Sequence, residues 1–178
     1  MSVLAQRLLA VHDALTEAQL AHAFGGAIAL AYCTEEPRGT RDLDVNIFSD
    51  PRNAAKVLAG LPSEVAVERG HVETAERDGQ VRVWWEDTPI DVFLNVHTLH
   101  ERFSMEIRWV SFEDRTIPVL GCTALILFKA LFNRTKDWAD IEEMVSAKAG
   151  DISQAIDWLS SLLGPKDQIV SRLESLAN

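Results

Sequence analysis

The sequence has few cysteines, no long apolar run and no excess of basic residues, and each absence narrows what the chain can be. Its two cysteines among 178 residues are Cys33 and Cys122. Both lie in apolar surroundings, so we expect a pair of buried intracellular thiols and not a disulfide. No apolar run approaches the length that spans a bilayer, and the first twenty residues lack the pattern of an export signal. A cytoplasmic protein with no membrane partner is therefore expected.

Acidic residues outnumber basic residues in the sequence. There are 17 Lys and Arg residues against 27 Asp and Glu residues, which gives a formal net charge of −10. Such a surface repels polyanions at long range, so a general, sequence-independent nucleic-acid binder is disfavoured. Basic groups can still gather locally, and the candidates for such a patch are Arg38, Arg41, Lys129, Arg134 and Lys136.

The length suits one well-buried core and is short for two independent domains. No internal repeat, linker or low-complexity stretch divides the chain. Strand-like segments end before Gly121, and the pattern is helical from there on. We therefore expect a single domain of residues 1–178, in which an α/β core (residues 1–120) is followed by a helical subdomain (residues 121–178) packed on it.

Local patterns predict the main elements of this core. Apolar spacing predicts a helix over residues 2–17, and Asp50 before Pro51 predicts a helix that runs to about Ala59. Residues 77–80 have the composition of a hairpin turn between strands at 72–75 and 81–85. A further strand is expected from Ile90 to Val96. Breaks between the late helices are expected at residues 133–135, at Gly150 and at residues 164–165.

Two acids mark the most informative part of the sequence. Asp42 and Asp44 are two residues apart in an apolar run, so on a strand both carboxylates point to one side, about 7 Å apart along the backbone. Two anions on one face repel each other unless a cation lies between them. Hard divalent ions such as Mg²⁺ bind carboxylate oxygens and keep open positions for substrate phosphates. The spacing therefore predicts a divalent-metal site.

A glycine pair precedes these acids. Gly25 and Gly26 separate a strand-like segment, residues 20–24, from a helical one, residues 27–31. At such a turn, bare backbone N–H groups can approach a phosphate. A glycine pair can also form a tight turn without any ligand. The acids that follow Gly26 favour the phosphate interpretation.

Together these motifs resemble the nucleotidyltransferase superfamily, whose pattern is a glycine pair, a spacer, an acid pair and a third acid on a neighbouring strand. The third acid here is Asp91, in the segment Pro89–Phe93. The closer likeness is to small bacterial AbiEii/MenT-type nucleotidyltransferases, because the glycines lead to the basic segment 38–41 before Asp42. Residues 125–141 look like the helical segment of those proteins. The spacer is longer than the commonest version, and lincosamide-type antibiotic nucleotidyltransferases have a similar approach to the acid pair.

The resemblance implies a fold and an activity. The fold is a mixed, strongly twisted sheet flanked by helices, with Asp42, Asp44 and Asp91 on adjacent strands. The activity is the metal-dependent transfer of a nucleoside monophosphate from an NTP, such as ATP, to an acceptor. That acceptor could be RNA such as tRNA, a protein or a small molecule, and a toxin–antitoxin setting would add a cognate protein partner.

The resemblance also assigns roles to residues. Asp42 and Asp44 would hold the Mg²⁺ or Mn²⁺ ion that carries the triphosphate, and Asp91 would help to hold a second ion. Phosphate contacts would come from two glycines and three cations: Gly25, Gly26, Arg41, Lys129 and Lys136.

Other interpretations of the same residues remain open. Asp42 and Asp44 could lie on the solvent face of an edge strand, and Asp91 could cap a turn. Lys136 and Asp140 have the spacing of an exposed helical ion pair, and Asp137 could cap the same helix. For the whole protein, the alternatives are an idle nucleotide-binding or antitoxin-like module, an antibiotic nucleotidyltransferase, and a glycosyltransferase, which the short chain and the glycine pair disfavour.

Overall fold

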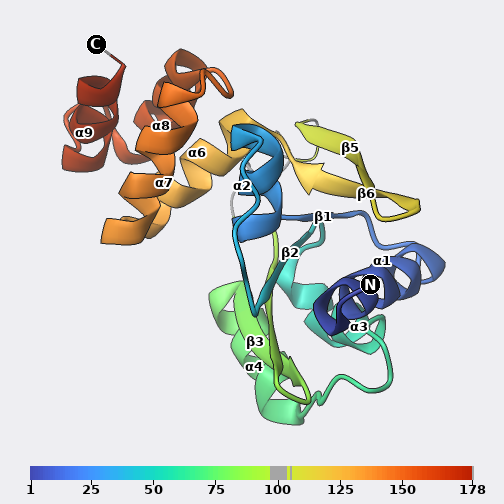
Figure 1. Cartoon of the computed structure of the whole chain (residues 1–178). Coiled ribbons are helices and arrows are strands. Elements are labelled where there is room, and N and C mark those ends of the chain that lie inside the picture. Colours follow the sequence, from blue (N-terminus) through green and yellow to red (C-terminus); the bar gives the residue numbers. More distant parts are fainter. Residues whose placement is uncertain (97–103, 105, 178) are drawn as a thin grey trace.

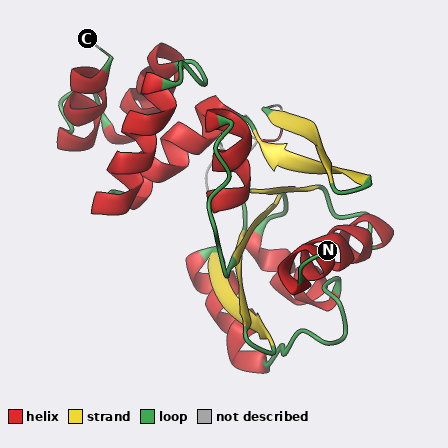
Figure 2. Ribbon diagram, viewed as in Figure 1, coloured by secondary structure: helices red, strands yellow, loops and turns green. Residues whose placement is uncertain are grey.

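A computed structural model describes residues 1–96, 104 and 106–177 of the chain. It contains a six-stranded mixed sheet flanked by helices (Figures 1 and 2), so the predicted fold class is confirmed. The strands are β1 (His22–Phe24), β2 (Leu43–Ile47), β3 (Gln80–Trp85), β4 (Thr88–Phe93), β5 (Ile107–Phe112) and β6 (Arg115–Leu120). The helices are α1 (Val3–Glu17), α2 (Gly26–Thr34), the short 3₁₀ helix η1 (Pro51–Asn53), α3 (Ala54–Ala59), α4 (Arg69–Asp78), α6 (Cys122–Phe132), α7 (Thr135–Ser146), α8 (Ile152–Leu163) and α9 (Gln168–Leu176).

The sheet has the strand order β3-β4-β2-β1-β6-β5. β2 pairs parallel with β4 and antiparallel with β1, while β3–β4 and β5–β6 are antiparallel pairs. Along β3, Val81 and Val83 are buried and Arg82 between them is exposed. This alternation follows from the two-residue period of a strand, with one face on the core and the other open.

The predicted helices at both ends of the chain are present. α1 begins where the Ser2 side chain accepts a hydrogen bond from the Ala5 backbone N–H, and its apolar face is fully buried at Leu8, Val11 and Leu15. Asp50 accepts from the Arg52 backbone N–H at the start of η1, and α3 then ends at Ala59, as predicted.

After Leu120, the described chain is helical, with breaks at the predicted positions. Asn133, Gly150 and Gly164 all have a positive φ. α6 packs against α7, α8 and α9, and α2 packs against both α6 and α7. Figure 1 shows α6 to α9 gathered at one end of the molecule, with α1, α3 and α4 at the other end and α2 between them. The division into a core and a helical subdomain stays a prediction. None of the described helices is long and apolar enough to cross a bilayer.

The predicted hairpin at residues 77–80 is wrong. Residues 69–78 form α4, and Gly79 ends this helix with a φ of 67°. A glycine in the left-handed region serves both hairpin turns and helix ends, so the local composition does not separate the two. The hairpin lies one strand later, between β3 and β4, with Glu86 at a φ of 51°. β4 ends at Phe93, three residues before the expected Val96.

The expectation of two free thiols is also wrong. Cys33, in the last turn of α2, forms a disulfide with Cys122, the first residue of α6. Both cysteines are buried, as predicted. Their Cα atoms are 5.7 Å apart, a separation that suits a disulfide. The two residues are 89 positions apart in sequence, so only the packing of α2 against α6 reveals that they meet.

Reduction of this disulfide should lower the melting temperature of the protein. A cross-link that closes a loop of this length restricts the unfolded chain and stabilises the fold by about 2–4 kcal/mol. For a chain of this size, we expect a drop of roughly 4–15 °C on reduction. Scanning calorimetry with and without a phosphine reductant measures it. A Cys33→Ser, Cys122→Ser double variant should not respond to the reductant, and an equal response in that variant would contradict the assignment.

Candidate functional site

Three residues on adjacent strands and a glycine that directly follows a fourth strand form a row across the sheet. Arg82 of β3 lies directly opposite Asp91 of β4, and Asp91 lies opposite Asp44 of β2. The backbone N–H of Gly25, next to β1, donates to the Asp44 carbonyl at 2.8 Å. Directly opposed residues on paired strands point to the same face. The three side chains and the glycine turn therefore share one side of the sheet.

This row decides between the interpretations that the sequence left open. β2 lies between β4 and β1, so Asp44 does not belong to an edge strand, and Asp42 directly precedes the same inner strand. Asp91 lies inside β4 and pairs with residues on both neighbours, so it does not cap a turn.

The glycine turn fits tightly over Asp44. Gly26 begins α2 with a φ of 52°, and a Cβ atom added there would lie 2.6 Å from Asp44 Cγ and overlap its Oδ2 atom. Gly25, the N-cap residue, has no side chain to cap the first turn of α2. The free N–H groups of that turn and the positive end of the helix dipole suit an anion.

A cavity of about 250 Å³ opens between this row, α2, α6 and α7. Asp42, Asp44 and Asp91 all line it, so the structure brings the three predicted acids together. Among the predicted phosphate contacts, Gly26, Lys129 and Lys136 also line it, and Gly25 lies next to it. Arg41 is exposed and does not line the cavity. Further lining side chains include Arg38, Thr40, Asn46, Arg82, Phe128, Phe132, Arg134, Asp137 and Asp140.

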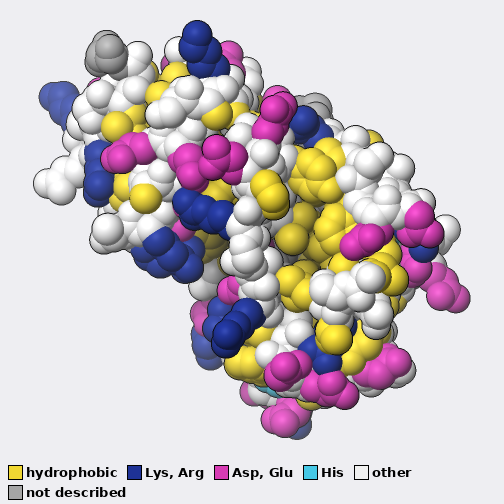
Figure 3. Space-filling model, viewed as in Figure 1, with side chains coloured by type: hydrophobic (Ala, Val, Ile, Leu, Met, Phe, Trp, Pro, Cys, Tyr) yellow, Lys and Arg dark blue, Asp and Glu magenta, His cyan; other side chains and the backbone are white. Residues whose placement is uncertain are grey.

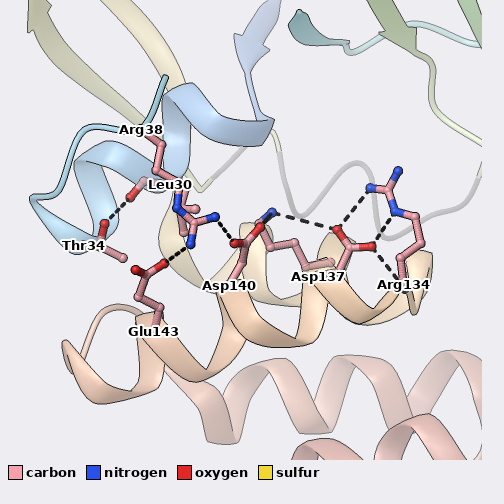
Figure 4. A network of polar contacts seen from close by, with 8 residues as sticks. Leu30, Thr34, Arg38, Arg134, Asp137, Asp140 and Glu143 are labelled. Carbon is pink, nitrogen blue, oxygen red and sulfur yellow. Dashed lines mark hydrogen bonds and ion pairs between the residues drawn. The ribbon is translucent and has the colours of Figure 1, made fainter. Parts of the chain in front are cut away.

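One wall of the cavity is a network of alternating charges (Figure 4). Lys129 of α6 is 7% exposed and donates to Asp140 of α7 at 2.6 Å. Arg38, from the loop after α2, also donates to Asp140 and reaches Glu143 at 2.7 Å. The network ties this loop and α6 to α7. Figure 3 shows basic and acidic side chains beside each other where the helical end meets the rest of the molecule.

The same network continues to Arg134. Asp137 is 1% exposed and accepts from Arg134 Nε at 2.6 Å and from the Arg134 backbone N–H at 3.2 Å. Hydrogen bonding of the guanidinium itself to Asp137, more than any other cause, raises the pKa of Arg134, and the charges of Asp137, Asp44 and Asp91 raise it further. Asp137 therefore caps the helix, as one of the open alternatives held, but from the third position of α7 and not from the residue before its start. The alternative Lys136–Asp140 pair is wrong, because the buried Asp140 carboxylate forms ion pairs with Lys129 and Arg38 instead.

Asp44 is the least compensated of the three acids. No hydrogen bond or ion pair reaches its carboxylate from the described residues, whereas Asp42 accepts from the Thr40 hydroxyl at 2.6 Å. Asp91 is held by Arg82. Burial, and then the neighbouring charges of Asp91 and Asp42, raise the pKa of Asp44 to about 6. A site that disfavours its own anion in this way favours a cation beside it.

The carboxylates of Asp42 and Asp44 are chemically suited to a divalent ion. Asp42 and Asp44 offer the hard carboxylate oxygens that Mg²⁺ prefers, and a cation there would relieve the unfavourable ionisation of Asp44. In the described ranges, however, no three Asp, Glu, His or Cys side chains lie together as a preformed metal group.

Two lining residues escaped the sequence analysis. Arg82 lies between two valines in β3, and its position opposite Asp91 follows only once the hairpin turn is placed at residues 86–87. Asn46 is 4% exposed, and its Oδ1 atom has no partner among the described residues. It continues the alternation that begins at Asp42 and Asp44, which is a signal that the sequence offered.

No protein-family model matches the chain, and no curated protein matches it in sequence. Among solved structures, it is similar to ANT(2")-Ia in complex with adenylyl-2"-tobramycin, with 12% identity, a TM-score of 0.60 and coverage of 99% of this chain and 100% of that one. It is also similar to lincomycin-bound LnuA, a lincosamide antibiotic adenylyltransferase (16% identity, TM-score 0.54, 80% and 96% coverage). A third similar structure is an antigenic nucleotidyltransferase-like protein from Paracoccidioides brasiliensis (14% identity, TM-score 0.55, 96% and 94% coverage). The chain therefore has the nucleotidyltransferase-like fold that its motifs predicted.

Substitution of Gly26 by alanine should destabilise the protein and displace Asp44. The positive φ of Gly26 and the overlap with Asp44 Oδ2 both oppose a Cβ atom, and we expect a loss of about 1–3 kcal/mol in the free energy of unfolding. Urea denaturation measures it. Gly39→Ala is the matched control, since a Cβ atom at this cavity-lining glycine meets nothing within 4 Å. Equal effects of the two substitutions would contradict the close approach of Gly26 to Asp44.

Asp44→Asn should stabilise the protein at neutral pH but not in acid. The pKa of Asp44 is raised from 3.8 to about 6 in the folded protein, which corresponds to about 3 kcal/mol of unfavourable ionisation. As the pH rises from 4 to 6, the unfolded chain ionises Asp44 while the folded chain keeps its proton, so the parent loses stability. Above pH 6, the penalty stays constant.

We therefore expect the variant to exceed the parent by about 1–3 kcal/mol at pH 8 and to equal it near pH 4. Thermal unfolding of both proteins across this pH range is the measurement. The control is Asp157→Asn, a substitution of an exposed aspartate on α8. Its stability should have the same pH dependence as that of the parent. A constant difference between Asp44→Asn and the parent at every pH would show that Asp44 is not buried as described.

Proposed function

We propose that the protein is a metal-dependent nucleotidyltransferase that moves a nucleoside monophosphate from an NTP to an acceptor hydroxyl. The observation that carries this proposal is the row of Asp91, Asp44 and Gly25. Like-charged carboxylates lie on adjacent strands, beside an uncapped helix start and a cavity lined with cations. The nucleotidyltransferase-like fold supports it.

The reaction joins the acceptor oxygen to the α-phosphorus of the NTP. The bond from that phosphorus to the oxygen that bridges to the β-phosphate breaks, pyrophosphate leaves with the bond's electron pair, and the acceptor proton passes to water or a nearby base. When bound at Asp42 and Asp44, Mg²⁺ supplies positive charge for the triphosphate and the leaving group. Gly25 and Gly26 present backbone N–H groups to the phosphates.

Arg134 and Lys136 are the better-placed cations for the triphosphate. Both side chains are exposed at the cavity, and Asp137 fixes the Arg134 guanidinium through two hydrogen bonds. Lys129 is buried in its contact with Asp140, so a phosphate reaches its ammonium group less easily than the exposed Arg134 guanidinium. We therefore assign Lys129 mainly to the cavity wall and Arg134 to phosphate contact.

The acceptor is best sought among small molecules. A net charge of −10 repels RNA at long range. Two proteins of similar fold are described with antibiotics, one with adenylyl-2"-tobramycin and one with lincomycin. A toxin–antitoxin role of the AbiEii/MenT type, with an RNA or protein acceptor, is the alternative. It follows only from the sequence motifs.

An NTP together with Mg²⁺ should raise the melting temperature, and neither should do so as well alone. A ligand at 100 times its dissociation constant stabilises the folded state by about 2.7 kcal/mol, so a shift of roughly 5–10 °C is expected. Without metal the three acids repel the triphosphate. The metal-dependent part of the shift should vanish in an Asp42→Asn, Asp44→Asn double variant and persist in Asp157→Asn.

Transfer is then tested with α-labelled NTPs and a fractionated cell extract. Label in the small-molecule fraction supports the proposed acceptor class, and label in RNA or protein supports the toxin–antitoxin alternative. A thermal shift without any transfer indicates an idle binding module. No shift with any of the four NTPs and either Mg²⁺ or Mn²⁺ would refute the nucleotide site.

A further inference from the structure

Asp91, the third acid, already has a cation of its own. Arg82 donates through Nε to Asp91 Oδ1 at 2.8 Å and through Nη2 to Oδ2 at 2.7 Å. Both oxygens of the carboxylate are therefore engaged by one guanidinium. This two-point geometry is the strongest form that an arginine–carboxylate pair takes.

The backbone fixes this pair. Arg82 and Asp91 are directly opposed in the antiparallel β3–β4 hairpin, whose register is held from Gln80–Phe93 to Trp85–Thr88. An arginine guanidinium stays charged at any working pH, and both hydrogen bonds hold it against Asp91. A positive charge thus lies permanently beside Asp91.

The charges of the row match one divalent ion. Asp42, Asp44 and Asp91 carry three negative charges, and the Arg82 guanidinium removes one. Two negative charges remain, and Asp44 is the acid without a partner among the described residues. A second divalent ion at Asp91 would have to displace Arg82 or bind against its charge.

We infer that Arg82 takes the place of a second divalent ion, so that the site binds one ion with the nucleotide, held by Asp42 and Asp44. The inference rests on the proposed function and replaces the expectation from the motifs that Asp91 shares a second ion. It makes Arg82 a residue of the reaction site. Arg82 and Asp91 both also line a second cavity of about 430 Å³, which adjoins the first and includes Thr74, Asp78 and Gln80.

The position of Arg82 between the two cavities gives it a second use. The first cavity holds the cations assigned to the triphosphate, and Arg82 and Asp91 line both cavities. An acceptor that approaches from the second cavity would therefore meet a fixed guanidinium where a metal ion would otherwise lie. An arginine can offset charge on the α-phosphate from this side without binding or releasing an ion.

The test counts ions per bound nucleotide. Parent protein is dialysed to equilibrium against Mn²⁺ and a non-hydrolysable NTP analogue, and the retained Mn²⁺ and analogue are both measured. We expect one Mn²⁺ per analogue in the parent and two in Arg82→Ser, which frees Asp91. Arg82→Lys keeps the charge and should stay at one. Asp91→Asn added to Arg82→Ser should return the count to one.

Arg52→Ser is the matched control, because Arg52 forms the same two-point contact with Asp50 at an exposed position. It should leave the count at one. Circular dichroism checks each fold, and Arg82→Gln, which removes the charge but keeps a longer polar side chain than serine, replaces Arg82→Ser if that variant does not fold. Two Mn²⁺ per analogue in the parent, or one in Arg82→Ser, would overturn the inference. If the parent retains no analogue at all, the proposed function itself fails.

Discussion

The parallel pairing of β2 with β4 is the constraint on which the site depends. It sets Asp44 directly beside Asp91, so two carboxylates share one face of the sheet. A row of like charges is unfavourable unless other groups compensate it. Much of the surrounding structure supplies that compensation: Arg82 from β3, the N-terminus of α2, and the cations of α6 and α7.

The basic side chains at the helical end of the molecule are held in position by acidic partners. Lys129 and Arg38 meet at Asp140, and Arg134 is fixed by Asp137. Long basic side chains lose rotamer freedom when they bind a ligand, and prior fixation by an acid reduces that loss. Asp137 and Asp140 are almost fully buried, and removal of Asp137 would leave Arg134 without its acidic partner. Removal of Asp140 would leave Lys129 with only its 4.0 Å contact to Asp137. The acids of α7 therefore help to shape the proposed binding surface even though no ligand need touch them.

The sequence was most informative where chemistry and strand period coincide. Through their resemblance to nucleotidyltransferases, the alternation of Asp42 and Asp44, the glycine pair and Asp91 predicted the fold. The same motifs also identified the acids that line the cavity. Contacts that depend on packing or pairing between separate segments were not predicted. Cys33 and Cys122 meet because α2 packs on α6, and Arg82 faces Asp91 because the hairpin turn lies at Glu86 and not at Gly79. A glycine that can end a helix or form a turn does not reveal which of the two it does until its neighbours are placed.

The disulfide gives α2 and α6 the geometry of two arms joined at one end. Cys33 lies seven residues after Gly26, and Lys129 lies seven residues after Cys122, so each arm is about 10 Å long. The glycine turn and the lysine that contacts Asp140 therefore lie some way from the disulfide along two helices that it joins at one end. The disulfide opposes separation of the two helices at that end. A small rotation of either helix about the disulfide would therefore displace most the residues beside the proposed triphosphate position.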